Sequence, residues 1–165
     1  MTKSIVIYNS RGGNTKKVAI NIAEGLGAEL VQYKKMPDLK DYDLVVLGTW
    51  VLAGNPSPHW KKKISKLDPE QLKGKNAVMF ICAGGPDNPP LGQGPEAGII
   101  KDLVFELMQK ALEDKGAKIA KERLAIHGTF RFFRFGLGAM DKGHPNEEEL
   151  KQAKKFGESL NKYLK

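Results

Sequence analysis

The sequence has few of the residues that build disulfide frameworks or metal sites. It contains one cysteine, Cys82, so no disulfide can form within the chain, which fits a reducing compartment without requiring one. Its three histidines, His59, His127 and His144, are far apart in the sequence and lack the spacing of metal ligands. We therefore expect neither a disulfide scaffold nor a metal centre.

Long apolar runs are also missing. The N-terminal stretch MTKSIVIYNS holds only about five apolar residues before polar ones return, which is too short for the core of a signal peptide. No window approaches the ~20 apolar residues of a membrane-spanning helix. The sequence favours a cytoplasmic protein without a membrane span. We expect one domain over residues 1–165, because no composition shift or repeat marks a boundary.

Acidic residues are in deficit. Aspartate and glutamate number 19 against 27 lysines and arginines, which gives a formal net charge of +8. A basic surface attracts acidic proteins, nucleic acids or lipid headgroups. The lysines are scattered rather than massed, which is more typical of a solvated surface than of a nucleic-acid site.

Apolar runs alternate with helical patterns along the chain. The runs predict buried strands at 4–8, 28–33, 42–49, 76–83 and 123–128. Helical spacing predicts a helix ending near residue 26 and further helices at 57–67, from 100 to about 111, and from 146 towards the C-terminus. Five strands alternating with four helices predict an α/β fold whose parallel sheet is covered on both faces.

Capping residues define several of these helix ends. Gly25 and Gly27 are predicted to end the first helix. Ser57 is a predicted N-cap for the second. Asn146 with Glu149 three residues later has the pattern of a capping box, which predicts the start of the last helix.

Three loops follow predicted strands and are rich in small or polar residues: 9–15, 49–56 and 84–94. In parallel sheets ligands bind outside the carboxyl ends of the strands, where the strand order reverses. The third loop is long, and loops of that length are usually functional or disordered. We therefore expect these three loops to form a binding site.

The first loop, in the stretch YNSRGGNTKKVA (8–19), has the residues that a phosphate needs. A helix N-terminus attracts anions because its first N–H groups are unpaired and carry partial positive charge. Gly12 and Gly13 allow the backbone to approach an anion closely, and Ser10, Asn14 and Thr15 add side-chain donors. The alternative to a phosphate-binding loop is a turn that binds no ligand and only connects a strand to a helix.

Other phosphate-binding motifs do not match the sequence of this loop. A P-loop ends in Gly-Lys-Ser/Thr, whereas this loop has Asn14-Thr15-Lys16. The nearest dinucleotide fingerprint, Gly136-x-Gly138, is incomplete and follows no clear strand. The end of the first strand lacks the acids of a phosphoacceptor domain. The residues after Cys82 lack the arginine of a cysteine phosphatase.

The stretch SIVIYNSRGGNTKKVAINIAEGL resembles the phosphate-binding signature of the flavodoxin family. The matching positions are Tyr8, Ser10, Gly13, Asn14, Thr15 and Ala19. Residues 45–58 and 80–90 are similar to the second and third flavin loops, and 143–160 to the closing helix. The resemblance spans nearly the whole chain. It implies a short-chain, flavodoxin-like, doubly wound five-stranded parallel sheet, in the order 2-1-3-4-5, with helices on both faces.

The resemblance further implies FMN as a noncovalent cofactor and a set of residues that contact it. The implied phosphate ligands are Ser10, Arg11, Gly12, Gly13, Asn14 and Thr15. The implied lining of one side of the flavin ring is Thr49, Trp50, Val51, Leu52, Ala53 and Gly54. The implied contacts of its other side or edge are Ala83, Gly84, Gly85 and Pro86. No catalytic residue of the protein is implied, since the flavin performs the chemistry.

Three functions stay open at this point. The resemblance favours a carrier that shuttles electrons between redox proteins. The alternative is an FMN-dependent oxidoreductase that acts directly on a nicotinamide, a quinone or a porphyrinogen. A third is a binding module that keeps the fold without flavin, against which the loop sequences argue.

The chain departs from the family in its charge and in one loop residue. Typical flavodoxins are acidic, whereas this chain carries +8, with Arg11 and Lys16 beside the implied phosphate. Positive charge near the ring favours the anionic reduced flavin, so a very low potential is not expected, and acidic partner surfaces are plausible. Leu52 stands where relatives often place a tyrosine against the flavin.

The segment GTFRFFRFGLGAM (128–140) interleaves four phenylalanines with Arg131 and Arg134. The favoured interpretation is an apolar connection that packs near the flavin, and the second is a partner or dimer surface through residues 130–135. Single-stranded nucleic acid, which such residues can stack on, is the least favoured. His127 is predicted to be structural, and Cys82 to be a buried, inert thiol.

Overall fold

Five parallel strands form the sheet at the centre of the protein. In spatial order they are β2 (Glu29–Gln32), β1 (Ser4–Asn9), β3 (Leu44–Leu52), β5 (Asn76–Ala83) and β6 (Lys118–His127). This order confirms the predicted 2-1-3-4-5 arrangement. A short strand, β4 (Asn55–Pro56), pairs antiparallel with the end of β3. The computed structural model describes residues 1–131 and 139–165.

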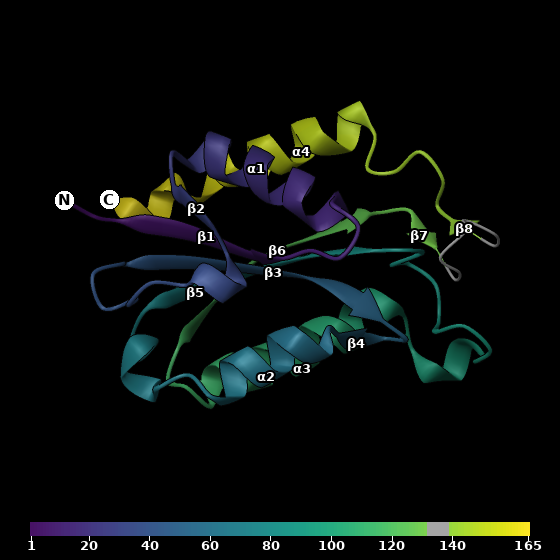
Figure 1. Ribbon diagram of the computed structural model, residues 1–165, viewed down its shortest axis with the longest axis horizontal. Coiled ribbons are helices and arrows are strands. Elements are labelled where there is room, and N and C mark those ends of the chain that lie inside the picture. Colours follow the sequence, from purple (N-terminus) through teal and green to yellow (C-terminus); the bar gives the residue numbers. More distant parts are fainter. Residues whose placement is uncertain (132–138) are drawn as a thin grey trace.

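Helices cover both faces of this sheet, as predicted (Figure 1). One layer consists of α1 (Asn14–Leu26) and α4 (Glu147–Ser159), and the other of α2 (Pro58–Ser65) and α3 (Ile100–Glu113). Short 3-10 turns lie at Tyr33–Lys35, Pro69–Gln71, Pro95–Ala97 and Leu160–Leu164. Within the described residues, no helix is long and apolar enough to cross a membrane.

Successive side chains of each strand point to opposite faces of the sheet, which divides the hydrophobic core into two halves. On β5, Met79 and Ile81 pack towards α2 and α3, whereas Val78 and Phe80 pack towards α1 and α4. All four side chains are almost completely buried. The ring of Phe80 lies against Gly48 of β3, where a Cβ would be 1.9 Å from a ring carbon. A buried strand between two helical layers explains the continuous apolar runs of the sequence.

Two of the predicted helix starts are confirmed in detail. The side chain of Asn146 accepts a hydrogen bond from the backbone N–H of Glu149, and the Glu149 carboxylate accepts one from the N–H of Asn146. Ser57 caps α2, where its hydroxyl oxygen accepts a hydrogen bond from the Trp60 N–H. The amide of Asn9 donates to the same hydroxyl, which ties the end of β1 to the start of α2.

The prediction that Gly25 ends the first helix is wrong. Helix α1 continues through Leu26 and ends at Gly27, whose φ of 68° is the left-handed conformation of a glycine cap. Gly25 instead lies at the contact between α1 and α4, where a Cβ would be 2.0 Å from the carbonyl oxygen of Lys154. Gly157 of α4 lies at the same contact between the helices, where its Cβ would be 2.2 Å from the carbonyl oxygen of Ile22.

Two strands are longer than predicted. Strand β3 runs to Leu52 rather than to residue 49, because its end folds back as a hairpin with β4. Most of the predicted second loop is therefore strand. Strand β6 begins at Lys118 rather than at residue 123. It lies at the edge of the sheet, so exposed charged residues such as Lys121 are tolerated there and mask the strand pattern.

The connection between β6 and α4 contains a second small sheet. Strands β7 (Phe130–Arg131) and β8 (Ala139–Met140) pair antiparallel near the end of β6. Residues 132–138, the greater part of the Phe/Arg segment, lie outside the described residues. The prediction of a dimer through residues 130–135 therefore stays a prediction.

Candidate functional site

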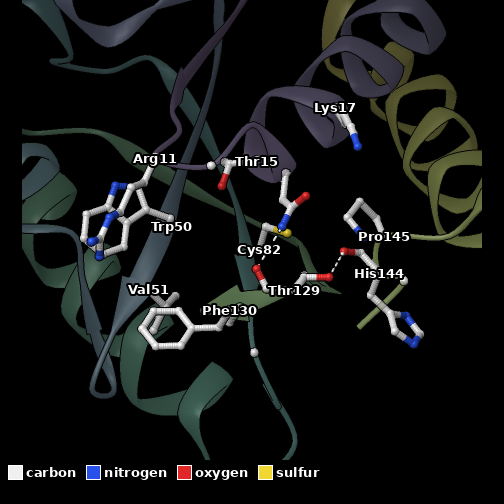
Figure 2. A pocket seen from close by; sticks show the side chains of 16 residues that line it. Arg11, Thr15, Lys17, Trp50, Val51, Cys82, Thr129, Phe130, His144 and Pro145 are labelled. Atoms are coloured by element: carbon white, nitrogen blue, oxygen red, sulfur yellow. Dashed lines mark hydrogen bonds between the residues drawn. The ribbon is translucent and has the colours of Figure 1, made fainter. Parts of the chain in front are cut away.

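A pocket of about 760 Å³ lies at the carboxyl ends of β1, β3, β5 and β6. This volume is within the range of small-molecule and cofactor sites. Eight of the predicted site residues line it: Arg11, Gly12, Asn14, Thr15, Trp50, Val51, Ala83 and Gly84. The other lining residues are Lys17, Cys82, Gly128, Thr129, Phe130, Gly143, His144 and Pro145. Figure 2 shows Arg11 and Trp50 on one side of the pocket and His144 and Pro145 on the opposite side.

The N-terminus of α1 forms one end of the pocket. Gly13 is its N-cap, with a left-handed φ of 94°, and the Gly13 N–H donates to the Ser10 hydroxyl over 3.1 Å. The first N–H groups of the helix have no partner within it. Thr15 is only 2% exposed, and its hydroxyl faces the pocket (Figure 2). Ser10 and Gly13 thus shape the loop, and Thr15 presents a donor.

The charged side chains that line the pocket are positive. Arg11 and Lys17 line the pocket, and the first turn of α1 holds no acidic residue. Among the described lining residues there is no aspartate or glutamate. The helix dipole adds further positive potential. This end of the pocket therefore attracts an anion.

Asn14 connects the first loop to the opposite wall. Its side-chain amide donates to the carbonyl oxygen of Thr129 over 3.0 Å. The Thr129 hydroxyl in turn lies 2.9 Å from the carbonyl oxygen of Asp141 and 3.1 Å from that of His144. Gly128 permits this close approach, because a Cβ there would be 2.4 Å from the sulfur of Cys82. These contacts fix the β6–α4 connection as a wall of the pocket.

The hairpin of β3 and β4 forms another wall. Val51 is buried, and the guanidinium carbon of Arg11 lies 5.6 Å from the ring centroid of Trp50, at cation–π distance. The hairpin turns at Ala53 and Gly54, whose φ angles of 48° and 75° are both left-handed, as a type I′ turn requires.

The remaining predicted residues of this hairpin do not line the pocket. Thr49 is fully buried, and its hydroxyl donates to the carbonyl oxygen of Trp50. Leu52 is exposed, Ala53 lies at the tip of the turn, and Gly54 faces Pro90 of the third loop. This leaves Trp50 and Val51 as the parts of the hairpin that face the pocket.

The loop after β5 contributes its first residues to the pocket. Ala83 and Gly84 line it, whereas Gly85 and Pro86 do not. The N–H of Gly85 donates to a carboxylate oxygen of Asp141 over 2.6 Å, and the carbonyl oxygen of Pro86 accepts from the N–H of Lys101 in α3. Gly85 and Pro86 therefore hold the loop in place.

The wall between β6 and α4 was predicted only in part, because segment 128–140 was expected to pack near the flavin but no residue of this wall was predicted as a contact. Its lining residues are Gly128, Thr129, Phe130, Gly143, His144 and Pro145, and Lys17 on α1 was also missed. A usable signal existed, because residue 128 follows a predicted strand and the carboxyl-end rule applies to that strand too. Sequence position alone did not show that residues 143–145 return to the same edge.

Cys82 lies at the base of the pocket and is 4% exposed. Burial, with added repulsion from Glu149 and Asp141, raises the pKa of its thiol to about 12. The prediction that this thiol is buried is confirmed. In the part of the chain that the structure describes, no group of three histidine, cysteine or acidic side chains could hold a metal ion.

Comparison with known proteins identifies the family of this chain. A family model for the flavodoxin domain matches residues 5–89. An uncharacterized protein of Methanocaldococcus jannaschii is 30% identical in an alignment that covers 96% of this chain and 97% of that protein. The flavodoxin-like domain-containing protein BilS of Clostridioides difficile is 29% identical, with 96% of each chain covered. This chain belongs to the flavodoxin family.

Solved structures agree on the fold. A flavodoxin from the domain Archaea superposes with a TM-score of 0.71 at 18% identity, and the match covers 99% of this chain and all of that one. At this identity the likeness establishes the arrangement of strands and helices. The roles of individual residues rest on the geometry of this chain.

Proposed function

We propose that this protein binds FMN in the pocket and passes electrons between redox partners. The observation that carries the proposal is the division of the pocket into two ends. The end at α1 is cationic and rich in N–H donors, and the other end lies between Trp50, Val51 and Ala83. FMN has the matching division, with a phosphate at one end and a flat, largely apolar ring at the other.

The residues present fit each part of FMN. Thr15, the first N–H groups of α1 and Lys17 would hold the phosphate. Among the described residues, and apart from its two chain neighbours, no atom lies within 4 Å of the position that a Cβ would take at Gly12, so a phosphate can approach the backbone there. Trp50 and Val51 would cover one side of the ring, with Ala83 and Gly84 at its other side or edge. When bound, FMN supplies the chemistry by taking up and releasing electrons.

The charges around the pocket determine whether the reduction potential of bound FMN is raised or lowered. With Arg11 and Lys17 in its lining and no carboxylate among the described lining residues, the pocket favours a reduced, anionic flavin. We expect a less negative second-electron potential than in a flavodoxin whose flavin is surrounded by acids. The net charge of +8 would steer partners with acidic surfaces towards this protein.

The experiment that tests the proposal combines binding with electron transfer. Purified protein is titrated with FMN, reduced anaerobically, and mixed with ferricyanide, an anionic one-electron acceptor. We expect the absorption spectrum of a bound flavin and reoxidation by ferricyanide at a rate that falls as salt screens the basic surface. The loaded protein alone should turn over neither NADH, NADPH nor a quinone.

Two results would overturn the proposal in different ways. If the purified protein is colourless and leaves the FMN spectrum unchanged, it does not bind FMN, and the roles proposed for the three loops are refuted as well. Sustained turnover with a nicotinamide or a quinone, without a protein partner, would make the protein an FMN-dependent oxidoreductase instead of a carrier.

A further inference from the structure

His127, at the carboxyl end of β6, has a carboxylate at each of its two ring nitrogens. Nδ1 lies 2.8 Å from Oδ2 of Asp141, and Nε2 lies 3.1 Å from Oδ2 of Asp87. A neutral imidazole has one N–H and can donate to only one carboxylate, whereas an imidazolium donates to both. The geometry is therefore that of a charged histidine bridging two acids.

The two acids belong to different walls of the pocket. Asp87 lies in the loop after β5, which supplies Gly84 to the lining. Asp141 follows β8 in the segment that supplies Gly143, and its Oδ2 also accepts the N–H of Gly85. His127 thus links the loop after β5 to the β6–α4 connection, two parts of the chain that are far apart in sequence.

Other charged groups face this bridge from the neighbouring helices. Lys101 of α3 pairs with Asp87 over 2.5 Å. The ring of His144 lies 5.7 Å from that of His127, and its Nδ1 is 2.9 Å from the Glu149 carboxylate of α4. His127 thus contacts two carboxylates directly. Lys101 neutralises part of the charge of Asp87, and the neighbouring His144 is paired with Glu149.

Burial and hydrogen bonding act in opposite directions on His127. Burial disfavours its charge, but the hydrogen bonds to Asp141 and Asp87 outweigh burial, so its pKa is raised. The pKa of Asp87 is lowered, first by Lys101 and then by His127. The bridge is partly exposed, with 34% of the His127 side chain and 55% of the Asp87 side chain accessible, so solvent screening keeps its effect modest.

We propose that His127 is a positioning residue that, as an imidazolium, joins the loop after β5 to the segment after β8 and thereby strengthens FMN binding. The part that concerns FMN rests on the proposed function. The bridge itself is a property of the protein without ligand.

Loss of the proton breaks one particular contact. The contact with Asp141 is shorter, and the Asp141 side chain is only 24% exposed, so Nδ1 keeps its proton. The lone pair of Nε2 then faces the carboxylate of Asp87, and the attraction becomes a repulsion. Because the folded-state pKa is raised, the bridge is complete below the unfolded pKa of about 6.5 and is lost as pH rises through the folded value.

The first test needs no flavin. The ring protons of His127 are followed by NMR against pH in the ligand-free protein, in the wild type, in Asp87→Asn and in Asp102→Asn, which removes an acid of α3 outside the bridge. We expect a raised His127 pKa in the wild type and in Asp102→Asn, and a lower one in Asp87→Asn. A wild-type pKa at or below 6.5, or no response to Asp87→Asn, would overturn the bridge.

The second test measures FMN affinity between pH 6.5 and 9 in the wild type, His127→Gln and His59→Gln. Expressing each affinity relative to His127→Gln at the same pH cancels the titration of the FMN phosphate. We expect a wild-type advantage of about two- to fivefold at pH 6.5, as for an exposed ion pair, that disappears by pH 9. His59→Gln should follow the wild type.

The outcomes separate the two proposals. An advantage that is absent, or equal at both pH values, would overturn the link between the bridge and FMN binding. Failure of every variant to bind FMN would overturn that link together with the proposed function, while the NMR titration would still decide whether the bridge exists.

Discussion

Replacing Thr15 by valine tests the phosphate end of the pocket. The side chain is 2% exposed, lines the pocket and comes from the first turn of α1. Valine has nearly the same shape, so the substitution removes a hydroxyl without opening a cavity. If Thr15 donates to the FMN phosphate, Thr15→Val removes one hydrogen bond to a charged group.

The size of the effect follows from that single hydrogen bond. A hydrogen bond to a charged group contributes about 1.5–3 kcal/mol, which corresponds to a 10- to 150-fold weaker affinity for FMN. Riboflavin is the matched control ligand, because it carries the same ring without the phosphate. We expect Thr15→Val to weaken FMN binding by this factor and to leave riboflavin binding nearly unchanged.

The assay is a fluorescence titration of wild type and Thr15→Val with both ligands. Urea unfolding of the two proteins without ligand checks that the variant is folded. An equal loss for FMN and riboflavin would mean that Thr15 supports the fold of the loop rather than the phosphate. No loss for either ligand would refute the role of the Thr15 hydroxyl as a donor to the phosphate.

Three further predictions concern stability and reactivity. Gly157→Ala should lower the free energy of unfolding by about 1–3 kcal/mol in urea melts, because its Cβ would meet the backbone of α1. The control Ser159→Ala, at an exposed position of the same helix, should change the free energy of unfolding little. Equal effects of the two substitutions would refute the contact between the helices. Lys162, with help from Tyr163, lowers the pKa of Glu122 to about 2, so the stability that Glu122 adds relative to Glu122→Gln should be present above about pH 4.5 and disappear towards pH 2. A difference that does not change with pH would contradict this pairing. Because the pKa of Cys82 is raised to about 12, its thiol should resist alkylation by iodoacetamide at pH 8 until the protein is unfolded, and rapid labelling of the native protein would contradict its burial.

The sequence was a good guide where a residue's role is local. Buried strands have continuous apolar runs, and helix starts have caps such as Ser57 and Asn146, so both could be read from a few neighbouring residues. The glycines of the first loop were informative for the same reason. A strand-to-helix turn that wraps an anion needs small residues at that position.

The errors concern contacts between distant parts of the chain. Gly25 has the local signal of a helix end, but its role is set by Lys154, which is 129 positions further on. The individual residues of the β6–α4 wall were not predicted, because Thr129 reaches the pocket through its contacts with Asn14 and His144. The contacts of His127 fit the structural role that was predicted for it, but its two carboxylate partners, Asp87 and Asp141, could not be predicted because they come from two other segments.

The central claim is that FMN binds between α1, the β3–β4 hairpin and the loop after β5. Its most direct test is an NMR titration of the isotope-labelled protein with FMN, following backbone amides. The account predicts saturation at one FMN per chain, with the largest shifts at Gly12, Thr15, Gly84 and Thr129. Absence of binding, or shifts centred on the outer face of α3 around Glu106 and Gln109, would contradict it.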